Sequence, residues 1–212
     1  MNTTIFDSFE KHKLIPVIEI PEVQHAEPLG EALLKGGLPL AEITFRTDCA
    51  AQAIKTMGSR FNELIIGAGT VLTIDQVKAA IDAGARFIVS PGIDAKVVEY
   101  CMAHYIPITP GAITPSEIQL AIQLGIEIIK FFPAEAAGGL NYLKAISGPF
   151  NKIRFIPTGG INQDNITGYL GFNKVLACGG SWIAPKKLIS EKRFDEIASL
   201  TEKALQQIKE SK

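Results

Sequence analysis

The sequence has few of the residues that build disulfide frameworks. Only three of its 212 residues are cysteines, and they stand far apart at Cys49, Cys101 and Cys178. The number is odd, and no two cysteines have the spacing of zinc ligands or of a stapled secreted domain. We therefore predict three reduced thiols, most of them buried.

Histidine is equally scarce. His12, His25 and His104 form no H-x-x-x-H or H-E-x-x-H pair. A mechanism that uses zinc or two metal ions would therefore lack its ligands. The sequence predicts no metal site.

Long apolar runs and blocks of basic residues are also missing. Charges interrupt the N-terminal stretch "MNTTIFDSFEKHKLIPVIEI", so we expect neither a signal peptide nor a membrane span. The 21 Lys and Arg residues nearly balance the 22 Asp and Glu residues, which argues against nucleic acid as a partner. With 47% hydrophobic residues, residues 1–212 suit one globular domain, which we expect in the cytoplasm.

Eight short apolar runs rich in β-branched residues recur along the chain. Their starts lie 19 to 27 residues apart, which leaves room for one strand and one helix in each repeat. The runs are "LIPVIEI" from Leu14, "AEITF" from Ala41, "LIIGAG" from Leu64, "FIVS" from Phe87, "IPITP" from Ile106, "EIIKFFP" from Glu127, "RFIPTGG" from Arg154 and "KVLACGG" from Lys174.

Between these runs the apolar residues follow a spacing of three and four, as in "TPSEIQLAIQLGI", which is typical of amphipathic helices. The ends of this stretch carry matching signals. Thr114, with Pro115 next and Glu117 three positions on, predicts a capped helix start, and Gly125 predicts the end. Strands that alternate with helices predict a parallel sheet.

Eight strand–helix units favour a closed (β/α)8 barrel, the TIM barrel of the α/β class. The alternative is an open doubly wound sheet, which more often carries a G-x-G-x-x-G turn after its first strand, and none is present. We expect the segment before Leu14 to form a helix that covers the bottom of the barrel. Residues 194–210 should form the final amphipathic helix.

In a parallel barrel the active site lies at the carboxyl ends of the strands. Side chains alternate along a strand, so Glu42 and Arg46 of "AEITFR" share one face. In "EIIKFFP", Lys130 shares a face with Phe132 and stands in an otherwise apolar run. If Lys130 points inward, it meets Glu42 across the narrow barrel.

Such a lysine suits nucleophilic chemistry. Burial disfavours the charged form of an amine, and the neutral amine attacks carbonyls to form a Schiff base, which acts as an electron sink. A nearby carboxylate can carry the protons, which makes Glu42 the candidate acid and base. Two structural interpretations stay open: Lys130 can extend to the surface along Phe132, and Glu42 can form an ion pair with Arg46.

Two glycine pairs end the seventh and eighth predicted strands, "PTGG" at Gly159 and Gly160 and "CGGS" at Gly179 and Gly180. Barrels often bind phosphate at these strands through backbone N–H groups, and Ser181 adds a hydroxyl. The pattern therefore predicts a phosphate site. We interpret Asn162 and Asn165, which follow the first pair, as helix caps.

The motifs together resemble a known family. "GAGTVL", "SPG", "KFFPAE", "GPF", "PTGGI" and "GGSW" occur in the order and spacing of the bacterial 2-keto-3-deoxy-6-phosphogluconate (KDPG) aldolases, which also act on 2-keto-4-hydroxyglutarate (KHG). The resemblance covers essentially the whole chain. It implies a (β/α)8 barrel and a class I aldolase of carbohydrate metabolism. Such an enzyme has no metal or other cofactor and is usually a homotrimer. It cleaves KDPG to pyruvate and D-glyceraldehyde 3-phosphate, and KHG to pyruvate and glyoxylate.

The resemblance also implies roles for individual residues. The Schiff-base lysine falls on Lys130, the acid/base glutamate on Glu42 and the carboxylate-binding arginine on Arg46. A substrate-contacting threonine falls on Thr70, and two residues of the pyruvate pocket fall on Pro91 and Phe132. The threonine linked to stereochemical preference falls on Thr158. The phosphate end falls on Gly159, Gly160, Gly180 and Ser181.

Glu19 departs from the family pattern, which has an apolar or sometimes basic residue at this place. A carboxylate at the mouth of the barrel would disfavour anionic substrates unless it is paired or turned to solvent. We expect Glu19 to face water at the rim.

Three other functions compete with this assignment. An aldolase for 2-keto-3-deoxy-6-phosphogalactonate should lack Arg46 and carry an apolar residue in place of Thr158. A phosphate-binding isomerase or decarboxylase would use Lys130 and Glu42 without an imine. A non-catalytic sugar-phosphate-binding barrel would give no reason for a lysine in an apolar run that faces a glutamate.

Overall fold

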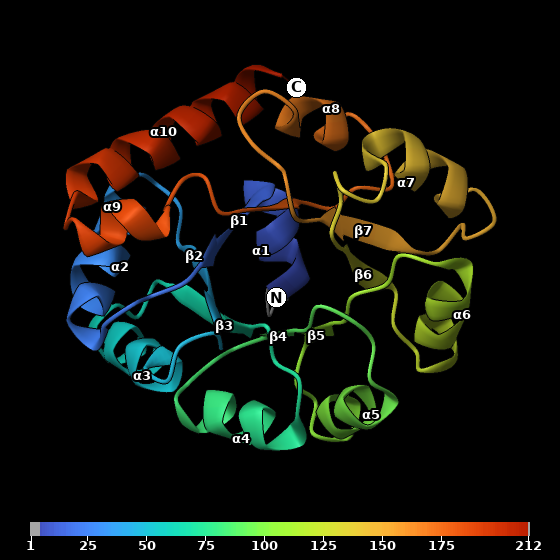
Figure 1. Ribbon diagram of the computed structural model, residues 1–212, viewed down its shortest axis with the longest axis horizontal. Coiled ribbons are helices and arrows are strands. Elements are labelled where there is room, and N and C mark those ends of the chain that lie inside the picture. Colours follow the sequence, from blue (N-terminus) through green and yellow to red (C-terminus); the bar gives the residue numbers. More distant parts are fainter. Residues whose placement is uncertain (1–4, 212) are drawn as a thin grey trace.

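Parallel strands form the wall of a barrel, and helices surround it (Figure 1). The computed structural model describes residues 5–211. The strands are β1 (Leu14–Ile18), β2 (Leu40–Thr44), β3 (Ile65–Gly69), β4 (Ile88–Val89), β5 (Ile108–Thr109), β6 (Ile128–Phe131), β7 (Arg154–Pro157) and β8 (Cys178–Gly180). The helices are α1 (Ile5–His12), η1 (Val23–His25), α2 (Ala26–Lys35), α3 (Ala50–Arg60), α4 (Ile74–Asp82), α5 (Ala95–Ala103), α6 (Pro115–Gln123), α7 (Gly139–Ser147), α8 (Ile166–Leu170), α9 (Lys186–Ser190) and α10 (Phe194–Glu210).

The strands close on themselves. Six of them pair in the order β5-β4-β3-β2-β1-β8, and β6 pairs with β7. Parallel bridges join the two sheets. One bridge, Gly111 to Lys130, lies on one side, and two bridges, Phe155 to Val175 and Thr158 to Gly179, lie on the other. The first and last strands pair directly, with Leu14 opposite Cys178. The predicted (β/α)8 barrel is therefore confirmed, and the open doubly wound sheet is wrong.

Local signals set the helix boundaries as the sequence predicts. At the start of α6, the Thr114 hydroxyl accepts from the Glu117 backbone N–H, and the Glu117 carboxylate accepts from the Thr114 backbone N–H. These two bonds satisfy backbone donors that the first helical turn leaves without a partner. After the helix, Gly125 adopts a φ of 78°, a left-handed conformation that glycine reaches without strain.

The N-terminal helix α1 lies across one end of the barrel (Figure 1). Its Phe9 is fully buried and meets Phe87 edge to face, with 4.9 Å between the ring centroids. Phe87 immediately precedes β4, so α1 covers the end where the strands begin. A side chain at Gly67 would lie 2.2 Å from the Phe87 ring, so glycine at that position makes room for this packing. The predicted bottom-capping helix is confirmed.

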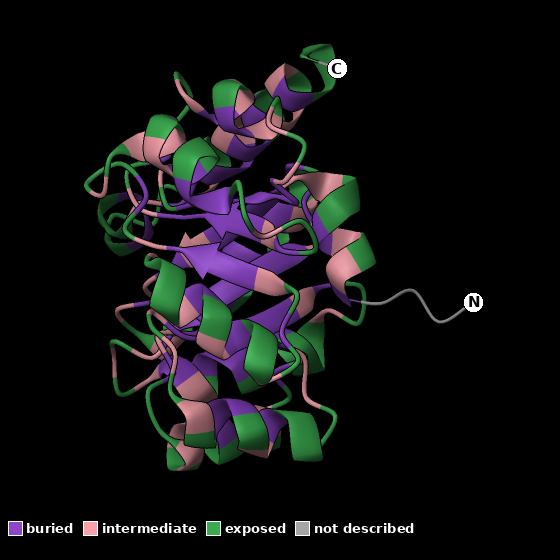
Figure 2. Cartoon of the chain, turned by 90° about the vertical axis from the view of Figure 1, so that its right-hand side faces the viewer, coloured by how far each residue is buried: buried purple, intermediate pink, exposed green. Residues whose placement is uncertain are grey.

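The core lies between the strands and the inward faces of the helices, while exposed residues gather on the outer helix faces (Figure 2). Cys101 and Cys178 are buried within it, Cys49 is half-buried, and all three are free thiols, as predicted. Burial raises the pKa of the Cys101 thiol to about 11 and also raises the pKa of Cys178. These thiols therefore stay protonated and unreactive at neutral pH.

The last helix, α10, is the longest and packs against α2. It presents Ile197, Ala204 and Ile208 inward, which confirms the predicted amphipathic pattern. Across residues 5–211, no helix has both the length and the apolar character that a membrane span requires.

Candidate active site

A cleft of about 460 Å³ opens at the carboxyl ends of β1, β2, β7 and β8. Most of the predicted site residues meet there. Of them, the cleft is lined by Arg46, Phe132, Thr158, Gly159, Gly160 and Ser181.

Lys130 and Glu42 are buried in contact with one another within the barrel. Lys130 is 5% exposed and Glu42 is 3% exposed, and 3.2 Å separates Lys130 Nζ from Glu42 Oε1. The ring of Phe132, which lines the cleft, lies 5.5 Å from the same nitrogen. The lysine therefore does not extend to the surface, and that structural interpretation is wrong.

Gly69 makes room for the Glu42 side chain, and Gly111 makes room for the neighbouring backbone at Pro91. A methyl group at Gly69, the last residue of β3, would lie 2.2 Å from Glu42 Oε1. One at Gly111 would lie 2.0 Å from the carbonyl oxygen of Pro91. The "GAGT" motif thus admits the Glu42 carboxylate to the barrel interior, where it reaches the amine.

Arg46 is exposed and lines the cleft, and its guanidinium has no ion-pair partner in the described part of the chain. The possible ion pair between Glu42 and Arg46 is therefore not formed, because Glu42 pairs with Lys130. Thr44, on the same face, donates its hydroxyl to the Ile18 carbonyl at 3.0 Å and so ties β2 to β1. Arg46 remains free to bind an anion.

Thr70 and Pro91 do not line this cleft. Pro91 lines a separate apolar depression of about 270 Å³ together with Val71 and Leu72. Thr70 is half-buried and has a φ of 56°, a left-handed conformation that is costly for a β-branched residue. Such strain concentrates at functional sites, but the sequence gives no sign of it.

The Gly159–Gly160 turn is held by its surroundings. Both glycines have left-handed φ values, 96° and 81°, and the Gly159 carbonyl accepts from the Glu135 N–H at 3.0 Å. The Asn165 side chain donates to the Gly160 carbonyl at 3.0 Å. Asn165 precedes α8 but makes no capping bond, and Asn162 accepts from the Asp164 N–H within its own turn. Our interpretation of these asparagines as helix caps is wrong, because their side chains bond within the loop.

Gly179, rather than Gly180, faces the cleft. A methyl group at Gly179 would lie 2.3 Å from Thr158 Oγ1, whereas one at Gly180 would lie 1.8 Å from the Trp182 ring. Gly180 is buried opposite Pro16 of β1. Of the predicted phosphate end, Gly180 therefore makes room for Trp182 and does not line the cleft.

Glu19 does not simply face water, which corrects our expectation. Its carboxylate pairs with Lys186 Nζ at 2.5 Å, and both residues line the cleft. The Glu19 side chain is 26% exposed and that of Lys186 is 58% exposed. Sequence reasoning missed Lys186 because the two residues stand 167 positions apart.

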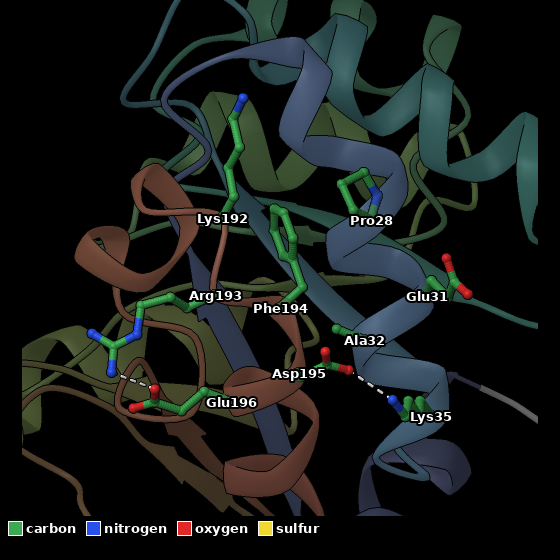
Figure 3. Close-up of a pocket in the computed structure, with 9 residues that line it drawn as sticks. All are labelled: Pro28, Glu31, Ala32, Lys35, Lys192, Arg193, Phe194, Asp195 and Glu196. Atoms are coloured by element: carbon green, nitrogen blue, oxygen red, sulfur yellow. Dashed lines mark hydrogen bonds and ion pairs between the residues drawn. The ribbon is translucent and has the colours of Figure 1, made fainter.

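Another groove, of about 510 Å³, lies outside the barrel between α2 and the start of α10 (Figure 3). Its charges are largely paired with one another, Lys35 with Asp195 and Arg193 with Glu196. No strand residue lines it. This groove is therefore separate from the strand ends. Within the described chain, no three His, Cys, Asp or Glu side chains are placed to hold a metal ion.

A buried amine in contact with a carboxylate, next to an open cleft at the strand ends, defines a barrel enzyme suited to Schiff-base chemistry. Comparison with known proteins gives the family. Residues 5–200 match the model of the KDPG and KHG aldolases. The chain belongs to this family and is an aldolase, a carbon–carbon lyase of class I.

Individual relatives match over nearly their whole length. The chain is 43% identical to 2-dehydro-3-deoxy-phosphogluconate aldolase of Treponema pallidum, over 96% of this chain and 97% of the relative. It is 41% identical to the KHG/KDPG aldolase of Escherichia coli, over 91% of each chain. The KDPG aldolase of Legionella pneumophila, solved with pyruvate captured as a covalent carbinolamine, superposes with a TM-score of 0.92 at 40% identity. That alignment covers 96% of this chain and 99% of the Legionella chain.

Proposed function

We propose that this chain cleaves KDPG to pyruvate and D-glyceraldehyde 3-phosphate through a Schiff base on Lys130. The observation that carries the proposal is the contact between the buried Lys130 amine and the Glu42 carboxylate beside the cleft. The names of the relatives and the pyruvate adduct of the Legionella enzyme support it.

In the first step, Lys130 Nζ attacks the C2 ketone, and loss of water gives the iminium. The Arg46 guanidinium, which lines the cleft, suits the C1 carboxylate, since guanidinium and carboxylate can form two parallel hydrogen bonds. We assign Phe132, which lines the cleft 5.5 Å from Lys130 Nζ, to the wall of the pyruvate pocket. The family resemblance assigns Thr70 to the same carboxylate and Pro91 to this wall, although neither residue lines the cleft.

In the second step, Glu42 accepts the C4 hydroxyl proton through a water molecule while the C3–C4 bond breaks. The electron pair of that bond moves into the iminium and gives an enamine, and the aldehyde leaves. Glu42 then returns a proton to C3, and hydrolysis of the resulting iminium releases pyruvate and regenerates the amine. The iminium acts as the electrophile, so the mechanism requires no metal.

The distal end of the substrate points toward the glycine-rich side of the cleft in this proposal. Backbone groups of the Gly159–Gly160 turn and the Ser181 hydroxyl then face the phosphate, and Thr158 lies near the carbon that becomes the aldehyde. Gly180 makes room for the ring of Trp182, and Trp182 lines the cleft.

The same chemistry on KHG yields pyruvate and glyoxylate, and we propose this as a second activity. The name of the Escherichia coli relative supports it. Arg46 and Thr158 favour the gluconate substrate over its galactonate epimer. The solved structure named for KDPGal is 24% identical to this chain and supports the fold alone.

Borohydride trapping tests the proposal. The protein is incubated with pyruvate and sodium borohydride and then studied by intact and peptide mass spectrometry. We expect one reduced pyruvate adduct, on Lys130, and none in Lys130→Met. A folded wild-type protein without an adduct would overturn the imine mechanism and favour an isomerase or decarboxylase that uses Lys130 as an acid or base.

We also propose that the protein is a homotrimer that works in the cytoplasm. Leu72 is 56% exposed beside the apolar depression at Pro91, which supports contact between copies there. Free, buried thiols fit a reducing compartment. Light scattering should give three chains for the wild type and a smaller species for Leu72→Glu, whereas a monomeric wild type would contradict the trimer.

A further inference from the structure

The wall of the cleft carries an ion pair that the catalytic steps above do not use. Lys186, the first residue of α9, contacts Glu19, which follows β1, at 2.5 Å between Nζ and the carboxylate. An exposed ion pair of this kind contributes little to stability. The position of this ion pair on the cleft therefore points to substrate binding rather than to stability.

The charges around the cleft have a definite order. In the barrel, β1 lies between β2 and β8. Glu19 thus stands between Arg46, which follows β2, and Lys186, which follows β8, and all three line the cleft. Glu19 pairs with Lys186, and within residues 5–211 Arg46 forms no ion pair. The two cations are therefore held apart on either side of one carboxylate.

This arrangement matches a substrate with an anionic group at each end. Lys186 lies on the same side of the cleft as Ser181, because both residues stand in the segment that follows β8. A single carboxylate at that wall would repel a phosphate, and pairing with Lys186 offsets this charge. The Lys186 ammonium has three donors, so contact with Glu19 leaves donors available for a second anion.

We propose that Lys186 determines specificity for the distal anionic group of the substrate, and that Glu19 is the positioning residue that holds it at the wall. This inference rests on the proposed function, because it takes the aldolase substrate to be the occupant of the cleft. Lys186 binds the phosphate and takes no part in the carbon–carbon cleavage.

The experiment compares KDPG with 2-keto-3-deoxygluconate, which has the same carbon skeleton but no phosphate. For Lys186→Met, we expect kcat/KM for KDPG to fall about 10- to 100-fold, the range for one hydrogen bond to a charged group. The loss should appear in KM, with kcat nearly unchanged, and kcat/KM for 2-keto-3-deoxygluconate should stay as in the wild type. Lys186→Arg should recover most of the KDPG activity because it restores the cation.

A matched control lies one position away. The Lys187 side chain is 78% exposed and does not line the cleft, and within residues 5–211 its one ion pair is with Glu191. Lys187→Met should therefore leave the kinetics with both substrates unchanged. An equal loss in Lys187→Met and Lys186→Met would overturn the proposal, as it would indicate a general effect of surface charge.

The double variant Glu19→Gln/Lys186→Met shows whether Lys186 binds the phosphate or only neutralises the charge of Glu19. If Lys186 binds the phosphate, the double variant stays as poor with KDPG as Lys186→Met. Recovery of wild-type KM would show that Lys186 only neutralises Glu19, and would overturn the proposal. An unchanged KM in Lys186→Met, or equal losses with both substrates, would also overturn it. Borohydride trapping of pyruvate in each variant reports on Lys130 alone, so failure of the aldolase assignment is recognised separately.

Discussion

Replacement of Lys130 by methionine tests whether the two buried charges stabilise one another. Methionine keeps an unbranched side chain but removes the ammonium, so Glu42, 3% exposed, loses its partner at 3.2 Å. Breaking a buried ion pair from one side costs about 3–5 kcal/mol, because the remaining charge stays buried. We therefore expect the free energy of unfolding of Lys130→Met to fall by about 3–5 kcal/mol, which lowers the urea midpoint.

Removal of both charges should reverse this loss. In the double variant Lys130→Met/Glu42→Met, no charge remains to be desolvated, and apolar side chains of similar length fill the space. Replacement of buried ion pairs by apolar groups is often neutral or stabilising by about 1–4 kcal/mol. We therefore expect the double variant to be at least as stable as the wild type although it has lost the amine.

The assay is urea unfolding at pH 7 followed by far-UV circular dichroism. The control is Arg154→Met, which breaks a pair with Glu10 whose side chains are 36% and 50% exposed. That variant should lose no more than about 1 kcal/mol. A wild-type urea midpoint for Lys130→Met would refute the reasoning. A double variant no more stable than Lys130→Met would show that the loss comes from packing.

Four further outcomes are expected. Gly69→Ala places a methyl group 2.2 Å from Glu42 Oε1 and should lower kcat about 100-fold by displacing the carboxylate; unchanged kcat with an unchanged circular dichroism spectrum would contradict this. Thr114→Ala should cost about 1 kcal/mol in urea unfolding, because the helix loses its cap. Burial acts to raise the pKa of Glu117, but hydrogen bonds from Ile113 and Thr114 outweigh it and lower that pKa. The stability Glu117 contributes is therefore complete above the ordinary glutamate range and should disappear in unfolding curves as the pH falls through its folded-state pKa. A chelator should leave turnover unchanged, and loss of activity that a divalent ion restores would overturn the imine mechanism.

The sequence predicts the architecture well because the signals that determine it are local. Repeated β-branched runs, amphipathic spacing and the Thr114 cap each act within a few residues, and eight repeats leave the barrel as the favoured closure. Strand alternation also places Glu42 on the face opposite the apolar Ala41 and Ile43. It leaves the direction of Lys130 open, because both faces of its run are apolar.

The parts of the site that the sequence misses depend on contacts between distant segments or on backbone conformation. The pairing of Glu19 with Lys186 joins two ends of the chain, and neither residue belongs to a motif. Asn165 has the residue type and place of a helix cap, yet the nearby Gly160 carbonyl takes its amide instead. Thr70 has a left-handed φ of 56°, a backbone conformation that no propensity for threonine predicts.

The pairing of β1 with β8 has a consequence for the order in which the protein becomes active. Leu14, among the earliest residues of the barrel to be synthesised, finds its partner Cys178 only after most of the chain has been made. Lys130 and Glu42 are both translated before that point, but the wall around them is not closed. The ribosome must therefore synthesise nearly the whole polypeptide before the first turnover can occur. Until β8 emerges, the edge of β1 in the nascent chain stays unpaired.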